Sequence, residues 1–262
     1  MLEINQIYNI DCLQGIKLLP DNSVDLIVTS PLYNFGGFNR GGTKSSYDVY
    51  FDSMSDEDYK KWTKEYFKEL FRVLKPTGMF YFNIKYRYSD YQCNIPFWVT
   101  EISKFKLLNL VVWKFASSPD VAKIKWYPRH EYIFVFIKSK DYYFDENYAK
   151  YGDVWDIPQV MANSSERTEH PAQYPTKLIK RIIDSSCKDK GIVLDPFMGS
   201  GTTAEVAYQC NKNYIRFEIS KKYIEIAKKR LSQKVLFPLT ENQEGGNGLP
   251  PTEKSVGILP MI

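Results

Sequence analysis

Residues 192–207 read IVLDPFMGSGTTAEVA, a short apolar strand that stops at Asp195 and Pro196 and continues through two glycines into a helix. Gly199 and Gly201 allow the backbone to approach a ligand closely, and the helix that follows presents free N–H groups to an anion. A strand, a glycine loop and a helix at the carboxyl edge of a parallel sheet are typical of nucleotide-binding sites. A tight structural turn would use the same residues, so this loop alone leaves both interpretations open.

The strand predicted next, NYIRFEIS at residues 213–220, favours the ligand-binding interpretation. Glu218 lies where this strand ends, a position from which a carboxylate commonly accepts hydrogen bonds from ribose hydroxyls. No Gly-Lys-Ser/Thr follows the glycines, which excludes a phosphate-binding P-loop. Thr202 and Thr203 at the helix start suit a carboxylate better than a pyrophosphate, so an adenosine joined to an amino acid would fit.

A second strand ends in the same abrupt way, in DLIVTSPLYNFGG at residues 25–37. The apolar run Leu26–Val28 is followed by Thr29, Ser30 and Pro31, which end the strand. Tyr33 then stands at the mouth of a glycine-rich loop. The stretch is either a plain turn or a place where something flat is held.

Strands alternate with helical patterns along most of the chain, which is typical of an α/β protein with a parallel sheet. The predicted strands are residues 7–11, 24–30, 78–84, 107–115, 130–139, 192–197 and 213–220. The predicted helices are residues 12–19, 55–75, 96–105, 175–188, 201–210 and 221–233. We therefore expect one domain over residues 1–236.

Several segments interrupt this alternation. Residues 34–49 are rich in glycine and predict a mobile loop, whereas residues 116–129 and 141–167 are polar, aromatic and irregular. The tail at residues 237–262 is rich in glycine and proline, so we expect it to be extended or flexible.

The composition is that of a soluble globular protein. The chain has 262 residues, 44% of them hydrophobic, and a formal net charge of +4, which permits a nucleic-acid partner without requiring one. Its four cysteines lack the paired spacing of a zinc site or disulfide framework, so we expect no metal and a reducing, cytoplasmic setting. No apolar run approaches the roughly 18 to 20 residues of a membrane helix, and the first residues do not resemble a signal peptide.

Taken together, TSPLY at residues 29–33 and DPFMGSGTT at residues 195–203 resemble the motifs of the DNA amino-methyltransferases. The catalytic motif precedes the cofactor loop, which resembles the permuted order of the beta class of that family. The resemblance extends over residues 7–231. It includes IDCLQ, VLKPTGMFYFNI, HEYIFVF, VWDIP, HPAQYPTKL and FEISKKYIEIAKKR.

This resemblance implies a Rossmann-like methyltransferase fold, with a mostly parallel twisted sheet, helices on both faces and S-adenosylmethionine as cofactor. It places Asp11 near the adenine ring, Glu218 at the ribose, and His170 with its neighbours over the methionine end. The implied cofactor-binding residues are Asp11, Thr29, His170, Asp195, Phe197, Gly199, Ser200, Gly201, Thr202 and Glu218.

The implied activity is site-specific transfer of a methyl group to an exocyclic amine of a base in duplex DNA. Such an amine is a poor nucleophile because its lone pair is delocalised into the ring. Ser30 Oγ and the carbonyl of Pro31 can accept its hydrogen bonds and free the lone pair, while Tyr33 stacks on the base. A duplex base is reached by flipping it out, after which direct attack depends mostly on positioning. No Pro-Cys occurs, which argues against methylation of cytosine carbon 5.

The first residue of the catalytic motif bears on the target base. The family commonly has aspartate there for adenine N6 and serine for cytosine N4, so Ser30 favours cytosine. Leu32 replaces the second proline that is usual in the family, which leaves the geometry of the turn open. Three alternatives remain: an adenine enzyme, an inactive cofactor- or nucleic-acid-binding protein with Leu32 as the lesion, and an enzyme acting on RNA or protein amines.

The remaining predictions concern DNA and protein partners. Residues 116–129 and 141–167 are candidates for target recognition, although a solvated basic face would show a similar pattern. The predicted substrate-binding residues are Leu32, Asn34, Arg40, Lys44, Lys123, Lys125 and Arg129. The resemblance also allows a homodimer, and it implies a restriction–modification system with a restriction endonuclease acting on the same site.

Overall fold

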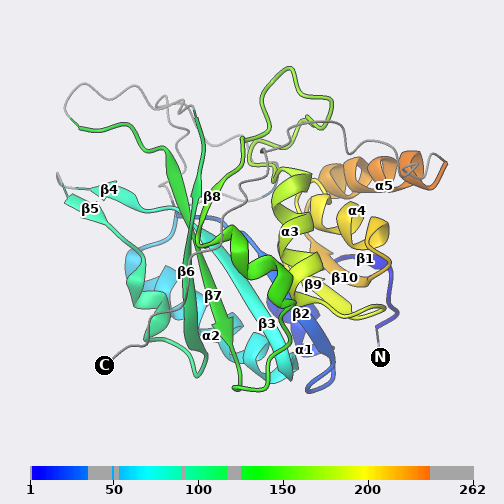
Figure 1. The fold of residues 1–262 in the computed structure, drawn as a ribbon, viewed down its shortest axis with the longest axis horizontal. Helices are drawn as coiled ribbons and strands as arrows, with labels where there is room; N and C mark the ends of the chain where they lie inside the picture. The colour runs from blue at the N-terminus through cyan, green and yellow to red at the C-terminus, as the bar shows by residue number, and fades with distance from the viewer. Residues whose placement is uncertain (1, 35–48, 50–52, 90–91, 117–124, 237–262) are drawn as a thin grey trace, which may run out of the picture.

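The computed structural model describes residues 2–34, 49, 53–89, 92–116 and 125–236. An eight-stranded sheet runs through this part of the chain in the order β1-β10-β9-β2-β3-β7-β6-β8, with helices on both of its faces (Figure 1). This arrangement confirms the predicted α/β class with a mostly parallel sheet.

The first five strands of that order run parallel to one another. They are β1 (Gln6–Asn9), β10 (Asn213–Glu218), β9 (Ile192–Asp195), β2 (Val24–Thr29) and β3 (Leu74–Ile84). Next come β7 (His130–Ile137), antiparallel to β3 and to β6, then β6 (Lys106–Lys114) and β8 (Val154–Asp156), which is parallel to β6. A separate small hairpin pairs β4 (Arg87–Ser89) with β5 (Gln92–Asn94).

Two hydrophobic layers enclose the sheet. On one face lie α1 (Cys12–Lys17) and α2 (Asp56–Val73), and on the other lie α3 (Thr176–Ser186), α4 (Thr202–Gln209) and α5 (Lys221–Leu236). Two short 3-10 helices, η1 (Phe97–Thr100) and η2 (Glu146–Tyr151), lie in the connections.

Helix α2 shows how the sequence builds one of these layers. Ser55 caps its start by accepting a hydrogen bond from Asp58 N at 3.0 Å. Apolar residues recurring at three- and four-residue spacing place Tyr66, Phe67 and Leu70 on one buried face. The Phe67 ring meets the rings of β3 and β7 edge-on, so truncating it to alanine would cost about 3–5 kcal/mol.

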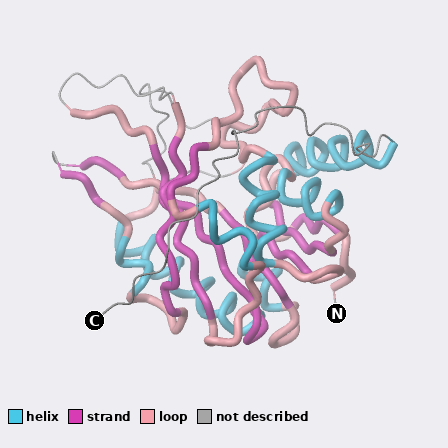
Figure 2. Tube along the Cα trace, in the orientation of Figure 1, coloured by secondary structure: helices cyan, strands magenta, loops and turns pink. Residues whose placement is uncertain are grey.

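The strand order brings the two abruptly ended strands of the sequence together. β2 and β9 are hydrogen-bonded neighbours, with Leu26 beside Val193 and Ile27 beside Leu194. Because both strands run in the same direction, the turn after Thr29 and the loop after Asp195 meet at one edge of the sheet. The connection from β8 to α3 rises above this edge, where Figure 2 shows it as loop.

Two predicted segments differ from the structure. Residues 96–105 were expected to form a helix but form only the 3-10 turn η1, in which Val99 is buried and Phe97 is 46% exposed. Residues 141–167 are less irregular than expected, since they contain η2 and the edge strand β8. Residues 117–124 and the tail at 237–262 lie outside the described residues.

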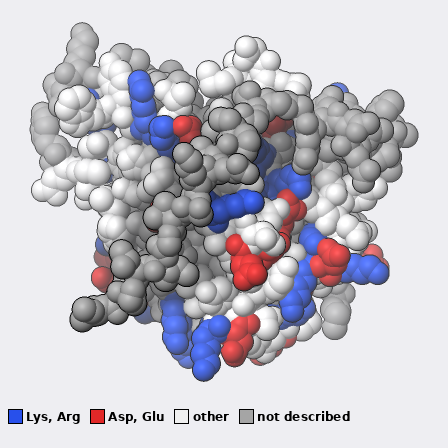
Figure 3. All heavy atoms as spheres, in the orientation of Figure 1, with Lys and Arg blue, Asp and Glu red and all other residues white. Residues whose placement is uncertain are grey.

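On the face drawn in Figure 3, basic and acidic side chains lie side by side and form no patch of one sign among the described residues. In the described part of the chain, no helix combines the length and apolar character needed to cross a membrane.

Candidate active site

Asp195 joins the two halves of the site. Its Oδ1 accepts hydrogen bonds from Thr29 Oγ1 and from Phe197 N, both at 3.2 Å, and its Oδ2 accepts one from Thr203 Oγ1 at 2.7 Å. The side chain is buried, which raises the pKa of its carboxyl, while Arg216 and these hydrogen bonds act in the opposite direction. Asp195 therefore connects β2, the glycine loop and α4 from inside the protein.

The two glycines of the loop adopt left-handed backbone conformations, with φ of +56° at Gly199 and +81° at Gly201. A Cβ atom at Gly199 would lie 2.7 Å from His170 Nε2, and one at Gly201 would lie 2.6 Å from Ala227 Cβ. The path of the loop therefore requires glycine at both positions, for backbone freedom and for lack of space.

Two predicted carboxylates lie at the ends of neighbouring strands. Glu218, at the end of β10, accepts hydrogen bonds from Gly199 N at 2.9 Å and from Ser220 N at 2.8 Å. Burial raises the pKa of the Glu218 carboxyl, and these backbone amides oppose that rise. Asp11, just after β1, caps α1 by accepting from Leu13 N at 3.0 Å and from Gln14 N at 3.2 Å.

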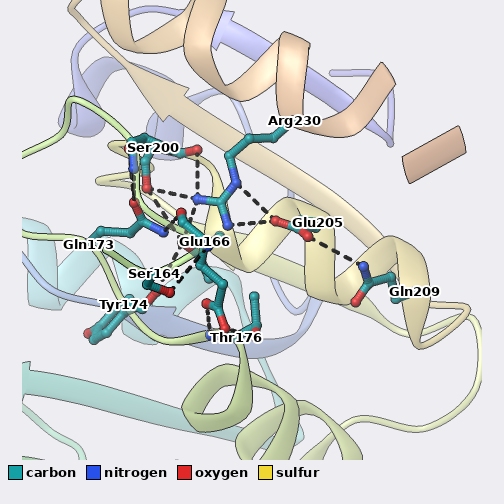
Figure 4. Close-up of polar contacts among 11 residues, drawn as sticks. Ser164, Glu166, Gln173, Tyr174, Thr176, Ser200, Glu205, Gln209 and Arg230 are labelled. Atoms are coloured by element: carbon teal, nitrogen blue, oxygen red, sulfur yellow. Dashed lines mark hydrogen bonds and ion pairs between the residues drawn. The ribbon is translucent and has the colours of Figure 1, made fainter. Parts of the chain in front are cut away.

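An ion pair that the sequence analysis missed supports the glycine loop (Figure 4). Arg230 of α5 donates through NH2 to Glu205 Oε2 at 2.6 Å, and through NH1 to Ser200 Oγ at 3.1 Å and Thr202 Oγ1 at 3.0 Å. Both side chains of the pair are buried, with relative exposures of 11% for Arg230 and 6% for Glu205. The sequence signal was a glutamate among apolar residues in GTTAEVAYQC.

The segment that carries HPAQYPTKL is braced internally and touches the loop. Glu166 accepts hydrogen bonds from Thr176 N and from Thr176 Oγ1, both at 2.9 Å. It thereby gives a partner to one of the backbone N–H groups that the first turn of α3 leaves without an intrahelical bond. Gln173 Nε2 donates to the carbonyl of Glu166 at 2.6 Å (Figure 4). Thr202 Oγ1 donates to the carbonyl of Tyr174 at 3.3 Å, which joins this segment to the glycine loop.

His170 lies between this segment and the loop, and its predicted role over the methionine end of the cofactor stays a prediction. Its ring meets Tyr223 edge-on with the centroids 4.5 Å apart, and its Nδ1 accepts a hydrogen bond from Ala172 N at 3.3 Å. Burial lowers the pKa of His170 to about 4, aided by the charges of Arg167 and Arg230. The imidazole is therefore neutral at neutral pH.

The turn after β2 forms a buried polar network. Ser30 Oγ lies 2.7 Å from the hydroxyl oxygen of Tyr33, and that hydroxyl donates to Glu131 Oε2 at 3.1 Å. Asn83 Nδ2 donates to Glu131 Oε2 at 2.8 Å and also to the Tyr33 hydroxyl. The sequence analysis missed Asn83 and Glu131. The available signal was that Glu131 falls in phase with buried Ile133 on β7, where a charged residue is unusual.

The other residues of this turn have structural contacts. The carbonyl of Leu32 accepts a hydrogen bond from the Tyr59 hydroxyl at 2.6 Å, which fixes the turn without a second proline. The side-chain amide of Asn34 pairs with the backbone of Met54, at 2.7 Å to N and 3.0 Å to O. This pairing joins the turn after β2 to the residue that precedes Ser55, the N-cap of α2.

The other predicted substrate contacts remain predictions. Lys125 Nζ lies 3.5 Å from the centroid of the Tyr88 ring, and Arg129 is exposed. Next to Lys125, the Trp126 side chain is 92% exposed. Arg40, Lys44 and Lys123 lie outside the described residues.

A cavity of about 680 Å³ lies away from this edge, where β9 and β10 begin. Two of its lysines pair with two of its aspartates, Lys180 with Asp184 at 2.6 Å and Lys212 with Asp189 at 2.5 Å. Its position at the amino ends of the strands separates it from Ser30 and the glycine loop. In the described part of the chain, no group of three or more His, Cys, Asp or Glu side chains could hold a metal ion.

Comparisons with known proteins identify the family of the chain. The model of the DNA methylase family matches residues 24–229. The chain is 34% identical to the type II methyltransferase M.BglII of Bacillus subtilis, over 87% of this chain and 69% of that protein. It is 31% identical to the DNA adenine methyltransferase YhdJ of Escherichia coli (strain K12), over 87% of this chain and 83% of that protein.

A solved structure shares the fold. The PvuII DNA methyltransferase, described as cytosine-N4-specific, superposes with a TM-score of 0.71 and covers 92% of this chain and 89% of its own. At 20% sequence identity the likeness concerns the fold alone.

Proposed function

The chain belongs to the N6/N4 DNA methylase family, and from that membership we propose that it transfers a methyl group from S-adenosylmethionine to the N4 amine of cytosine in double-stranded DNA. One observation carries the proposal: the turn with Ser30 and the glycine loop with Gly199 are held together at one sheet edge through Asp195. This arrangement supports the proposal that Ser30 accepts a base amine beside a loop that binds an adenosine joined to an amino acid.

The residues at this edge fit S-adenosylmethionine. Glu218 keeps carboxylate lone pairs beyond its two backbone amides, so it would accept hydrogen bonds from ribose hydroxyls. The left-handed glycines bring the backbone close to the ligand. Neutral His170 would cover the methionine end without placing a second cation beside the sulfonium. The cofactor, when bound, supplies a methyl group on a positively charged sulfur, which is already a strong electrophile.

Ser30, Pro31 and Tyr33 would position the amine. Ser30 Oγ and the Pro31 carbonyl accept its two N–H groups, which frees the nitrogen lone pair from delocalisation into the ring. Tyr33 would stack on the base after it leaves the duplex. The protein's contribution is thus mainly orientation, which can supply several kcal/mol of the barrier, about 7 to 11 in favourable cases.

Adenine N6 is the second candidate, and the 31% identity to a DNA adenine methyltransferase favours it. Ser30 at the first position of the motif favours cytosine. The test is to methylate mixed-sequence DNA with the purified protein, digest the DNA to nucleosides and identify the modified nucleoside by mass. N4-methyl-2′-deoxycytidine supports the proposal, whereas N6-methyl-2′-deoxyadenosine replaces it with the second candidate.

The same assay addresses the class of acceptor. DNA, RNA and protein are offered in competition with labelled S-adenosylmethionine. Label on RNA or protein alone would contradict the DNA substrate, and bound cofactor without transfer to any acceptor would support a binding protein that has lost catalysis.

We also propose that the chain works beside a restriction endonuclease acting on the same site. Expression of the chain should then protect cellular DNA from a nuclease of that specificity. A homodimer stays a prediction, which sedimentation of the purified protein would check.

A further inference from the structure

The hydroxyls of Ser30 and Tyr33 belong to a chain of hydrogen bonds that ends on a buried carboxylate. Ser30 Oγ lies 2.7 Å from the Tyr33 hydroxyl oxygen, which donates to Glu131 Oε2 at 3.1 Å. Glu131 comes from β7, two strands away from β2 in the sheet, and is 6% exposed. The chain thus leads from the predicted position of the substrate amine into the protein interior.

The direction of this chain follows from the groups that form it. An ionised carboxylate only accepts hydrogen bonds, and the single hydroxyl hydrogen of Tyr33 points to Glu131. Asn83 Nδ2 also donates to both the Tyr33 hydroxyl and Glu131. The Ser30 hydroxyl must therefore be the donor in its bond with Tyr33. The Tyr174 hydroxyl also hydrogen-bonds to Ser30 and takes up one lone pair of its oxygen. The other lone pair of Ser30 Oγ is left to accept a hydrogen bond from a substrate amine.

We propose that Glu131 is a positioning residue that sets this direction and receives, through Tyr33 and Ser30, the proton that the substrate amine loses. The inference rests on the proposed methyl transfer and deepens it by assigning an end to the path of the proton.

The proposed methyl transfer conserves bonds, protons and charge. The amine nitrogen forms a bond to the methyl carbon, the carbon–sulfur bond breaks, and its electron pair stays on sulfur. The nitrogen, now positively charged, gives one N–H proton to Ser30 Oγ. Ser30 passes its own hydroxyl proton to Tyr33, and Tyr33 passes its proton to the Glu131 carboxylate. A neutral methylated amine, a neutral thioether and a carboxylic acid result, and the acid returns its proton to solvent after product release.

The charges around Glu131 suit this path. Burial raises the pKa of Tyr33, and the charge of Glu131 raises it further, so Tyr33 holds its proton and relays it as a neutral phenol. Tyr174 also faces Glu131, and burial raises its pKa in the same way. On β7, burial and the charge of Lys85 lower the pKa of His130, so that its ring is neutral at pH 7. Glu131 is the one member of this hydrogen-bond chain that carries a carboxyl group.

The first test is Glu131→Gln, which keeps the size and a carbonyl acceptor for Tyr33 but cannot take a proton. Single-turnover transfer of labelled methyl to DNA is measured from pH 5.5 to 9, with cofactor affinity measured separately. General base catalysis contributes at least about 100-fold, so we expect a loss of about that size with unchanged cofactor affinity. We expect the wild-type rate to fall on acidification, and this fall to be absent in Glu131→Gln.

Two further variants separate the loss of a proton acceptor at Glu131 from the loss of a negative charge. Glu101 is exposed, so Glu101→Gln removes the same charge elsewhere and should keep the wild-type rate and pH profile. Glu131→Asp keeps a carboxylate on a shorter side chain, so it should be slower but retain the fall at low pH. Should Glu131→Gln fail to fold, Glu131→Asp decides, because a pH-independent rate in that variant would overturn the proposal.

The second readout needs neither cofactor nor DNA. Tyrosine labelled with ¹³C at Cζ is followed by NMR during a pH titration, and the Tyr33 signal is assigned from its loss in Tyr33→Phe. The Tyr33 signal should move with pH in the wild type and should stay constant in Glu131→Gln. A wild-type rate and profile in Glu131→Gln would overturn the proposal, as would an identical Tyr33 titration in both proteins. Absence of transfer by the wild type would instead contradict the proposed function.

Discussion

Arg230 of α5 and Glu205 of α4 form a buried ion pair, with NH2 2.6 Å from Oε2, and the same guanidinium donates to the side chains of Ser200 and Thr202. Because Arg230 uses its remaining N–H groups on the glycine loop, one side chain couples the packing of two helices to the shape of the predicted cofactor site. This coupling is the basis of the first prediction.

Arg230→Met should destabilise the protein by about 3–5 kcal/mol, because it leaves the Glu205 carboxylate buried without its partner. The double variant Arg230→Met/Glu205→Leu should recover most of that stability, since it removes both charges. The affinity of the double variant for S-adenosylmethionine should be lower than that of the wild type, because Ser200 and Thr202 have lost the hydrogen bonds that Arg230 donates. Urea unfolding and calorimetric titration measure the two quantities. Wild-type affinity in the double variant would show that Arg230 does not support the loop.

Gly199→Ala should weaken cofactor binding, because the added Cβ would lie 2.7 Å from His170 Nε2 at a φ of +56°. The left-handed conformation alone costs a non-glycine residue about 1–2 kcal/mol. Gly152 is the matched control, since its φ is +63° and a Cβ there would meet no atom within 4 Å. The ψ of Gly152 is −166°, outside the left-handed helical region, so Gly152→Ala introduces backbone strain without a new contact and should leave the cofactor affinity unchanged by calorimetry. Equal affinities in both variants would contradict the placement of the cofactor at this loop.

The stability of the protein should depend on His170 below neutral pH. The pKa of this side chain is about 4 in the folded protein against 6.5 as its ordinary value. The unfolded chain therefore binds the proton first, so stability is fully present above pH 6.5 and is lost as the pH falls towards 4. Between pH 7.5 and 5 the loss amounts to about 2 kcal/mol.

The variant His170→Phe keeps a ring against Tyr223 but has no group to protonate. Its free energy of unfolding should therefore fall between pH 7.5 and 5 by about 2 kcal/mol less than that of the wild type. The free energy of unfolding in urea at the two pH values measures this difference. Parallel pH dependence in the variant and the wild type would mean that His170 titrates normally in the folded protein.

Ser30→Ala should slow methyl transfer by about 100-fold, a size typical of removing one positioned hydrogen-bonding group from an active site. Its affinity for S-adenosylmethionine should be unchanged, because Ser30 lies in the turn after β2 and not in the glycine loop. Single-turnover transfer and calorimetry give the two values. Tyr33→Ala should behave alike through loss of stacking, and full activity of that variant on duplex DNA would show that the stacking role is wrong.

Helices and turns whose formation depends on neighbouring residues were predicted from the sequence alone. Apolar periodicity predicted α2, and the abrupt ends of β2 and β9 marked the two turns at which the site lies. Turn chemistry and periodicity depend on neighbouring residues, so they can be inferred from a single chain. The prediction of a helix at residues 96–105 was wrong, since only Phe97–Thr100 form a 3-10 turn.

Which side chains lie in contact is seen only in the folded structure. The Tyr33–Glu131 hydrogen bond joins residues 98 positions apart, and the Arg230–Glu205 pair joins residues 25 apart on two helices. Asp195 was predicted from its motif, but only the order of the strands placed its carboxylate against Thr29. A buried charge is stable only beside partners of suitable geometry. The packing of the whole sheet determines which residues become those partners, and local sequence patterns do not predict that packing.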